Sequence, residues 1–301
     1  MSPDLHLLSM PFYALLSRLP LSVLYGLSYC LYLCLYYIAR YRRAVVHNNI
    51  SLVFPEKDLS ETSALSKKFY RQLCDVAVEI IKARVLRPDD YQKRITLINS
   101  ELMETYRQQE QPVIILTIHA CNWEWMLHAT RLQLDIPIDA VYKSLHNKTA
   151  NDLIYDIRSR FGIRPLNVQE STKDVIRRRQ EFRLLTLVAD QSPIPREKSY
   201  WTTFLGQPSA FYQGAEKIAM LTKYPIVFAA MKRTRRGHYT VEYQPLAEPP
   251  YVKDSHDILD AYIAAAEKVI REQPESWLWS NRRWKRQAPE TLTKKTENEL
   301  S

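Results

Sequence analysis

Apolar and polar residues alternate along the chain in blocks that predict strands and helices in turn. Short apolar runs predict strands at 94–98, 113–118, 138–142, 184–189, 225–231 and 239–244. Apolar positions three and four residues apart predict helices at 61–86, 123–133, 148–161, 171–180, 209–222 and 255–272, with Ser60 as the N-cap of the first. This alternation predicts an α/β fold, a mostly parallel sheet flanked by helices and closed by an antiparallel hairpin around Arg235-Arg236-Gly237.

The first forty residues follow a different pattern. From Leu19 to Ala39 the chain carries no charged side chain over 21 residues, and about 20 apolar residues suffice to cross a bilayer as a helix. Arg18 alone precedes this run, whereas three arginines follow it at 40, 42 and 43, which places the C-terminal side in the cytoplasm. We expect an N-terminal transmembrane or membrane-anchoring helix within 1–40, an α/β domain over 41–286 and a polar tail over 287–301.

Two features of the apolar run favour an alternative. Its five tyrosines and Pro20 also suit an interfacial helix that lies on the membrane. A cleaved secretory signal is disfavoured, because no small-residue cleavage site follows the run and arginines end it. The N-terminal segment is therefore expected to stay attached, either as a single span or as a tightly bound peripheral helix.

Composition indicates a folded protein with an acidic partner. The 301 residues are 46% hydrophobic and 25% charged, and 42 basic against 33 acidic residues give a net charge of +9. Such a charge suits nucleic acid, anionic lipid, a phosphorylated substrate or an acidic protein. The four cysteines show neither the spacing of a zinc or redox site nor a disulfide framework, so we expect a reducing compartment.

The stretch TIHACNWEW at 117–125 carries the most informative polar residues. His119 and His128 are nine residues apart, which does not match a metalloprotease helix. The chain has no Gly-x-Ser-x-Gly elbow, and its five glycines form neither a P-loop nor a dinucleotide fingerprint. Serine hydrolase, nucleotide hydrolase and dinucleotide-dependent dehydrogenase activities are thereby disfavoured, and we expect no metal and no cofactor.

A general base with a carboxylate to orient it is the interpretation that remains for this stretch. His119 would take a proton from a substrate hydroxyl or amine, while Glu124 holds the other ring nitrogen. In one continuous helix the two residues would lie about 140° apart, so the motif requires a turn between them. Because no serine or cysteine nucleophile adjoins the pair, direct transfer to the substrate acceptor is the expected reaction.

These residues and several further segments resemble one protein family. His119-x-x-x-x-Glu124 is similar to the His-x4-Asp/Glu signature of the lysophospholipid acyltransferase superfamily, and its surroundings resemble the late acyltransferases of bacterial lipid A biosynthesis. The resemblance extends over most of the chain and includes RRAVVHNNISLVFPE at 42–56, VYKSLHNKTANDLIYDIRSRFG at 141–162, VADQSP at 188–193, FLGQPSAFYQGAEKIA at 204–219 and PESWLWSNRRWK at 274–285.

The resemblance implies roles for individual residues. His119 would be the general base and Glu124 its orienter, in agreement with the interpretation from the motif itself. Asn122 would cap the following helix or present amides to an oxyanion. One guanidinium of Arg158 and Arg160 would neutralise a phosphate or the oxyanion, although a solvated helix face explains both arginines as well.

Two further sets of polar residues complete the expected site. Asp190 and Gln191 end a predicted strand, where ligands of open α/β sheets gather, and would line the site or orient Arg158. In WLWSNRRWKR at 277–286 the tryptophans are expected to pack, and the basic residues to contact an acidic carrier or the membrane. These contact residues are Arg282, Arg283 and Lys285.

Taken together with the resemblance, the sequence predicts an inner-membrane O-acyltransferase with its catalytic domain on the cytoplasmic face. By resemblance it would move a fatty acyl chain from acyl-carrier protein to a hydroxyl of a phosphorylated lipid A precursor. Two alternatives remain open: another lipid acceptor, such as a lysophospholipid or an acylated amino acid, or a non-catalytic membrane adaptor. A nucleic-acid partner is not expected, because the chain has none of the usual binding motifs.

Overall fold

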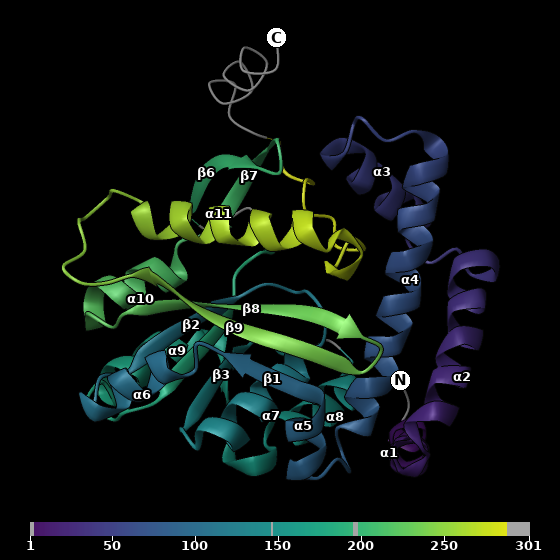
Figure 1. The fold of residues 1–301 in the computed structure, drawn as a ribbon, viewed down its shortest axis with the longest axis horizontal. Coiled ribbons are helices and arrows are strands. Elements are labelled where there is room, and N and C mark those ends of the chain that lie inside the picture. The colour runs from purple at the N-terminus through teal and green to yellow at the C-terminus, as the bar shows by residue number, and fades with distance from the viewer. Residues whose placement is uncertain (1–2, 146, 195–197, 288–301) are drawn as a thin grey trace.

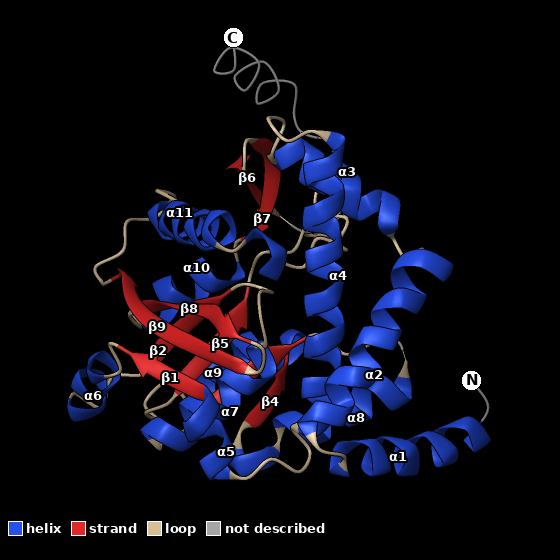
Figure 2. Ribbon diagram, turned by 45° about the vertical axis from the view of Figure 1, so that its right-hand side comes forward, coloured by secondary structure: helices blue, strands red, loops and turns tan. Residues whose placement is uncertain are grey.

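A seven-stranded sheet forms the centre of the molecule (Figures 1 and 2). The computed structural model describes residues 3–145, 147–194 and 198–287. The strand order is β1-β9-β8-β2-β5-β3-β4, and all neighbours are parallel except the β8–β9 hairpin. The strands are β1 (Ile95–Ile98), β2 (Val113–Thr117), β3 (Ile138–Tyr142), β4 (Arg164–Asn167), β5 (Leu184–Val188), β8 (Ile226–Arg235) and β9 (His238–Ala247).

Helices cover both faces of this sheet, because the central strands are apolar on both sides. In β2, Ile114 and Leu116 belong to one core cluster and Val113 and Ile115 to the other. The first cluster includes α11 (Asp257–Glu272) and α10 (Gly214–Thr222), and the second α7 (Trp123–Leu134) and α5 (Pro88–Arg94). Further helices of the domain are α6 (Glu101–Gln108), α8 (Lys148–Arg158) and α9 (Val168–Arg177), with short turns η2 (Arg160–Gly162) and η3 (Pro274–Ser276).

The N-terminal helices gather at one end of the molecule (Figures 1 and 2). They are α1 (Pro3–Arg18), α2 (Leu21–Leu33) with its π-helical extension η1 (Cys34–Ile38), α3 (Arg43–Val53) and the long α4 (Leu59–Lys82). Within the described residues one helical stretch, Leu21–Ile38, is long and apolar enough to cross a membrane, with a mean hydropathy of 1.6. This stretch packs along α4 (Figure 1).

The predicted α/β class with a mostly parallel sheet is confirmed, as is the hairpin at Arg235-Arg236-Gly237. The six predicted strands all exist. The prediction missed β4, the helices α3, α5 and α6, and a separate two-stranded sheet of β6 (Ser199–Phe204) and β7 (Gln207–Tyr212).

Two local predictions were wrong. Residues 209–213, assigned to a helix from 209 to 222, belong to β7 or to the turn after it, and α10 begins only at Gly214. The N-cap of α4 is Asp58 rather than Ser60, because Asp58 and Glu61 form a reciprocal capping box. The polar tail falls almost entirely outside the described residues.

A buried carboxylate on α4 ties the N-terminal helices to the sheet. Glu79 is fully buried and accepts hydrogen bonds from the Tyr25 hydroxyl of α2 at 2.8 Å, the Tyr239 hydroxyl of β9 at 2.6 Å and the Asn122 amide at 2.9 Å. Its backbone carbonyl accepts from the Trp125 indole at 2.9 Å. Burial raises the pKa of Glu79 above its ordinary value, although the three side-chain bonds oppose the shift.

Replacing this carboxylate should therefore loosen the fold. Glu79→Leu leaves two tyrosine hydroxyls and one amide without their acceptor, and each buried unpaired group costs about 1–3 kcal/mol. We expect the free energy of unfolding to fall by about 2–5 kcal/mol, measured by denaturant unfolding in detergent. Glu79→Gln, which keeps an acceptor oxygen, is the matched control and should lose less. Equal stability of Glu79→Leu and the unsubstituted protein would contradict this account.

Candidate active site

Two parallel strands bring the candidate base and its carboxylate together. β2 and β5 are neighbours, and Thr117 is paired in register with Val188 at their carboxyl ends. His119 and Asp190 each lie two residues beyond these partners. Because parallel strands end at the same edge of a sheet, the two side chains meet there although they are 71 positions apart in the sequence.

The contact between His119 and Asp190 is short and oriented. Asp190 Oδ1 lies 2.6 Å from His119 Nδ1, and its Oδ2 accepts the His119 backbone N–H at 3.0 Å. The Trp277 indole donates to the same Oδ2 at 2.7 Å. An ionised carboxylate can only accept, so Nδ1 carries the proton and Nε2 keeps its lone pair.

The Asp190 carboxylate is buried but held in its charged form. Burial alone would raise its pKa, but the His119 ring and the bonds from Trp277 and the His119 backbone outweigh this effect. The pKa of Asp190 therefore lies below its ordinary value. A charged acceptor at Nδ1 would stabilise the imidazolium formed if Nε2 took a proton.

The other side of the imidazole faces the site. His119 keeps 19% of its side chain exposed, whereas Asp190 keeps 2%. The Gln191 amide nitrogen lies 3.3 Å from His119 Nε2, and the Trp123 ring packs edge-on against the imidazole with 5.2 Å between ring centroids. Asp190 and Gln191 thus both contact His119. Asp190 therefore lines the site rather than orienting Arg158, whose carboxylate partner is Glu124.

A tight turn separates His119 from the helix that follows, as the motif requires. Cys121 adopts a left-handed conformation with φ of 54°, and α7 begins at Trp123. Asn122 is the N-cap, since its side chain accepts the Trp125 backbone N–H at 3.0 Å, while its amide is held by Glu79. The capping role expected for Asn122 is confirmed.

The expected contact between Glu124 and His119 is not made, and this corrects the sequence interpretation. Glu124 lies in the first turn of α7, is 2% exposed and forms a bidentate ion pair with Arg158, with Nε to Oε2 at 2.8 Å. The Trp123 indole donates to the same carboxylate at 3.1 Å. Asp190 occupies the ring nitrogen that Glu124 was expected to hold, because β5 ends directly beside His119.

Arg160 is held by backbone carbonyls. Its guanidinium donates to Ala83 and, at 2.9 Å, to Leu86, and it lies over the Phe161 ring at 4.5 Å. These contacts join η2 to the chain after α4. They give no support to a substrate-binding role for Arg160. Arg158, in contrast, binds the same Glu124 carboxylate as the Trp123 indole, and the Trp123 ring packs on His119.

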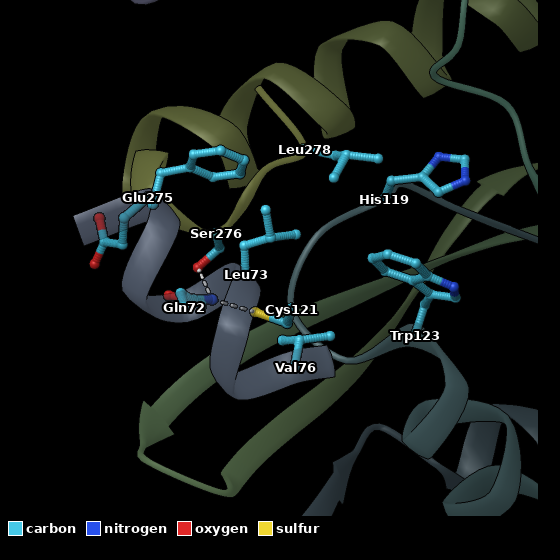
Figure 3. Close-up of a pocket in the computed structure, with 10 residues that line it drawn as sticks. Gln72, Leu73, Val76, His119, Cys121, Trp123, Glu275, Ser276 and Leu278 are labelled. Carbon is cyan, nitrogen blue, oxygen red and sulfur yellow. Dashed lines mark hydrogen bonds between the residues drawn. The ribbon is translucent and has the colours of Figure 1, made fainter. Parts of the chain in front are cut away.

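A hollow opens beside His119 between α4 and the segment that follows α11. Figure 3 shows His119 and Trp123 at one end of it and Glu275 at the other. Its α4 wall is largely apolar, and Gln72 bonds Ser276 at 2.9 Å. The lining residues are Phe69, Gln72, Leu73, Val76, His119, Cys121, Trp123, Glu275, Ser276 and Leu278. The base therefore borders a pocket that combines an apolar wall with a few polar groups.

The C-terminal segment packs directly under the motif. Ala120 and Trp277 form an antiparallel bridge, and the Leu278 backbone N–H donates to the His119 carbonyl at 3.0 Å. Trp277 and Trp279 are buried, so the packing expected for these tryptophans is confirmed. Trp277 is also a site residue that the sequence interpretation missed, because nothing in the local pattern connects its indole with Asp190.

The three basic residues expected to contact a carrier or the membrane are divided by the fold. Arg282 and Lys285 are exposed. Arg283 is only 2% exposed, with its guanidinium over the Phe211 ring at 4.4 Å and the Phe204 ring at 5.4 Å. Burial lowers the pKa of Arg283 to about 10, and the charge of Asp190 opposes the shift. A surface contact role for Arg283 is therefore wrong in this fold.

Comparison with known families agrees with the geometry. The family model described as bacterial lipid A biosynthesis acyltransferase matches residues 5–286, which includes every described residue of the site. No curated protein sequence matches the chain. The match extends from the N-terminal helices to the segment that bears Trp277 and therefore covers the whole fold. The chain belongs to the bacterial lipid A biosynthesis acyltransferase family.

Proposed function

We propose that the protein transfers a fatty acyl chain from an acyl-carrier-protein thioester to a hydroxyl group of a lipid A precursor. Membership of the family supports acyl transfer in lipid A biosynthesis. The observation that carries the chemistry is the His119–Asp190 pair, a partly exposed histidine that borders a pocket, with one ring nitrogen held by a buried carboxylate and the other in contact with the Gln191 amide. This arrangement suits a general base acting on a substrate hydroxyl.

In the proposed reaction His119 Nε2 accepts the proton of the acceptor hydroxyl as its oxygen attacks the thioester carbonyl carbon. The resulting tetrahedral intermediate collapses by breaking the carbon–sulfur bond, and the departing thiolate takes the proton back from Nε2. Proton and electron pairs thereby balance without an acyl-enzyme. Asp190 keeps the imidazole in the required tautomer throughout, and Gln191 yields its place at Nε2 to the substrate hydroxyl.

We propose that the Glu124–Arg158 pair stabilises negative charge on the substrate rather than orienting His119. The bidentate bond fixes the Arg158 guanidinium beside Trp123, which itself packs on His119. A fixed cation at this position suits the oxyanion of the intermediate or a phosphate of the acceptor. Glu124 would then contribute to catalysis through Arg158, and Asn122 by shaping the turn that carries both motif residues.

The apolar α4 wall of the pocket suits the acyl chain of the donor. Phe69, Leu73 and Val76 face the hollow that His119 borders. A thioester carbonyl near the imidazole with its chain against these residues would bury methylene groups, each worth about 0.8 kcal/mol.

The exposed Arg282 and Lys285 are the proposed contacts for the acidic carrier. The proposed location is the cytoplasmic face of the inner membrane.

The first prediction separates the two carboxylates. His119→Ala should lower kcat by about 10²–10⁴-fold or more, because it removes the group that accepts the proton of the hydroxyl. Asp190→Asn should approach that loss, because the imidazole loses the carboxylate that fixes its tautomer. Glu124→Ala should cost less in rate but more in stability, since it leaves the largely buried Arg158 charge without its carboxylate partner, a loss of up to about 3–5 kcal/mol. Turnover with a purified lipid A precursor and denaturant unfolding measure the two effects.

Gln191→Ala is the control, because it removes a contact at Nε2 that the substrate would displace and should cost the least turnover. Unchanged turnover in a folded His119→Ala protein would refute the assignment of the base. A Glu124→Ala protein slower than Asp190→Asn at equal stability would return the orienting role to Glu124.

The second prediction concerns the donor. Salt screens attraction between exposed charges beyond about 10 Å at 0.1 M, so kcat/KM for the carrier thioester should fall as ionic strength rises. Arg282→Glu with Lys285→Glu should produce the same loss at low salt, about tenfold or more, with kcat little changed. The assay supplies one acyl group as carrier thioester or as coenzyme A thioester.

Lys253→Glu is the matched control, because Lys253 is exposed in the loop between β9 and α11, away from the C-terminal segment. It should leave kcat/KM nearly unchanged. Equal use of the coenzyme A thioester would contradict the carrier, and preference for a lysophospholipid would contradict the lipid A acceptor. Either result would leave the His119–Asp190 chemistry standing.

A further inference from the structure

The N-terminal helices expose an apolar face that no described part of the chain covers. In α2 and η1 one residue per turn is buried, namely Leu24, Ser28, Tyr32 and Tyr36, and most of the others are exposed. Helix α1 lies at the same end of the molecule as α2 (Figure 2), and it also carries exposed apolar side chains. The exposed apolar side chains of these helices include Phe12, Leu15, Val23, Leu27, Leu31 and Ile38, with exposures from 37% to 79%.

The buried side of α2 is attached to charged residues of α4 along its whole length. The two helices are antiparallel: Lys82 donates to the Leu19 carbonyl at 2.9 Å, and Ser28 donates to Asp75 at 2.6 Å. Near the far end the Arg71 guanidinium lies over the Tyr32 ring at 5.2 Å. Arg71 and its neighbour Lys68 are exposed on the surface of α4.

The β8–β9 hairpin adds a further cation to the same helix. Arg236 donates to the Tyr25 carbonyl at 3.0 Å and to the Ser28 hydroxyl at 2.9 Å, and its side chain remains 44% exposed. The hairpin tip also lies against α2, since the space beside Gly237 is filled by the Tyr25 hydroxyl. A sheet hairpin with exposed backbone and arginines is not tolerated in hydrocarbon.

These contacts decide how the apolar face can meet a membrane. Leu21–Ile38 measures about 27 Å as a helix, close to the bilayer core, and Tyr32 lies about 16 Å along it. If α2 crossed the bilayer in this packing, α4 would cross with it, carrying Arg71 to the middle of the hydrocarbon. An orientation parallel to the membrane surface keeps Arg71, Lys68 and Arg236 in water or among headgroups.

We propose that α1 and α2 form an interfacial membrane-docking surface, with the protein embedded in one leaflet of an anionic bilayer rather than spanning it. The apolar outward side chains enter the headgroup and acyl boundary, and the basic residues beside them meet anionic headgroups. Arg18, Arg40, Lys68 and Arg71 are exposed near this face, while Asp75 and Glu79 are buried. The inference builds on the membrane location proposed above, and it is independent of the acyl-transfer chemistry.

Depth measurement along α2 tests the orientation. Cys30 and Cys34 are exposed on this helix, whereas Cys74 and Cys121 are buried, so Cys30→Ser with Cys34→Ser gives a background for single probes. Each variant then carries one nitroxide on one introduced cysteine and is bound to vesicles of phosphatidylcholine and phosphatidylglycerol. The four substitutions are Val23→Cys, Leu27→Cys, Leu31→Cys and Ile38→Cys. Acyl transfer by each labelled protein confirms that the fold is retained and tests the proposed function separately.

The two orientations give opposite depth profiles. An in-plane helix places all four nitroxides within a few ångströms of one shallow depth, about 5–10 Å below the headgroups. A spanning helix separates positions 23 and 38 by about 22 Å along the membrane normal, with 31 deepest. The second profile would overturn the proposal, and absence of vesicle binding by active protein would overturn both the docking surface and the membrane location.

Charge substitutions test the leaflet partner. Lys68→Glu with Arg71→Glu should weaken binding to vesicles that contain phosphatidylglycerol by about 25-fold or more, since each of the two basic residues near an anionic surface contributes about fivefold. Lys253→Glu, in a loop that Figure 1 shows at the end opposite α2, should leave binding unchanged. Equal loss from both variants, or no loss from the double variant, would contradict specific docking through this face.

Discussion

The Asp190 carboxylate is the group on which the geometry of the candidate active site depends. It accepts the imidazole N–H and the backbone N–H of His119 and the indole N–H of Trp277. Three segments far apart in the sequence therefore meet at one buried charge: the end of β2, the end of β5 and the stretch after α11. A buried carboxylate is costly unless its lone pairs are satisfied, and these three donors satisfy it.

A second buried carboxylate supports the same region from the opposite side. Glu79 of α4 holds Asn122, the N-cap whose turn separates His119 from Glu124, and it also holds Tyr25 of α2. Helix α2 and the turn between His119 and Glu124 thus share one partner on α4.

The identity of the carboxylate that contacts His119 is a part of the site that the sequence did not predict. His119 and Asp190 directly follow the predicted strands at 113–118 and 184–189, and parallel strands gather polar residues at one edge. Closeness in sequence favours Glu124, but its position in the first turn of α7 directs it to Arg158 instead. The adjacency of β2 and β5 depends on strand order, and no local pattern encodes strand order.

The sequence by itself determined the fold class, the central strands, the apolar N-terminal segment and the motif that holds His119, because these depend on local periodicity and residue type. It also located Asp190 and Gln191 at a strand end. Tertiary structure alone decided that Asp190 rather than Glu124 contacts His119, that Trp277 joins them and that Arg283 is buried. It also set charged residues of α4 beside the apolar helix, because each of these contacts joins segments that only packing brings together.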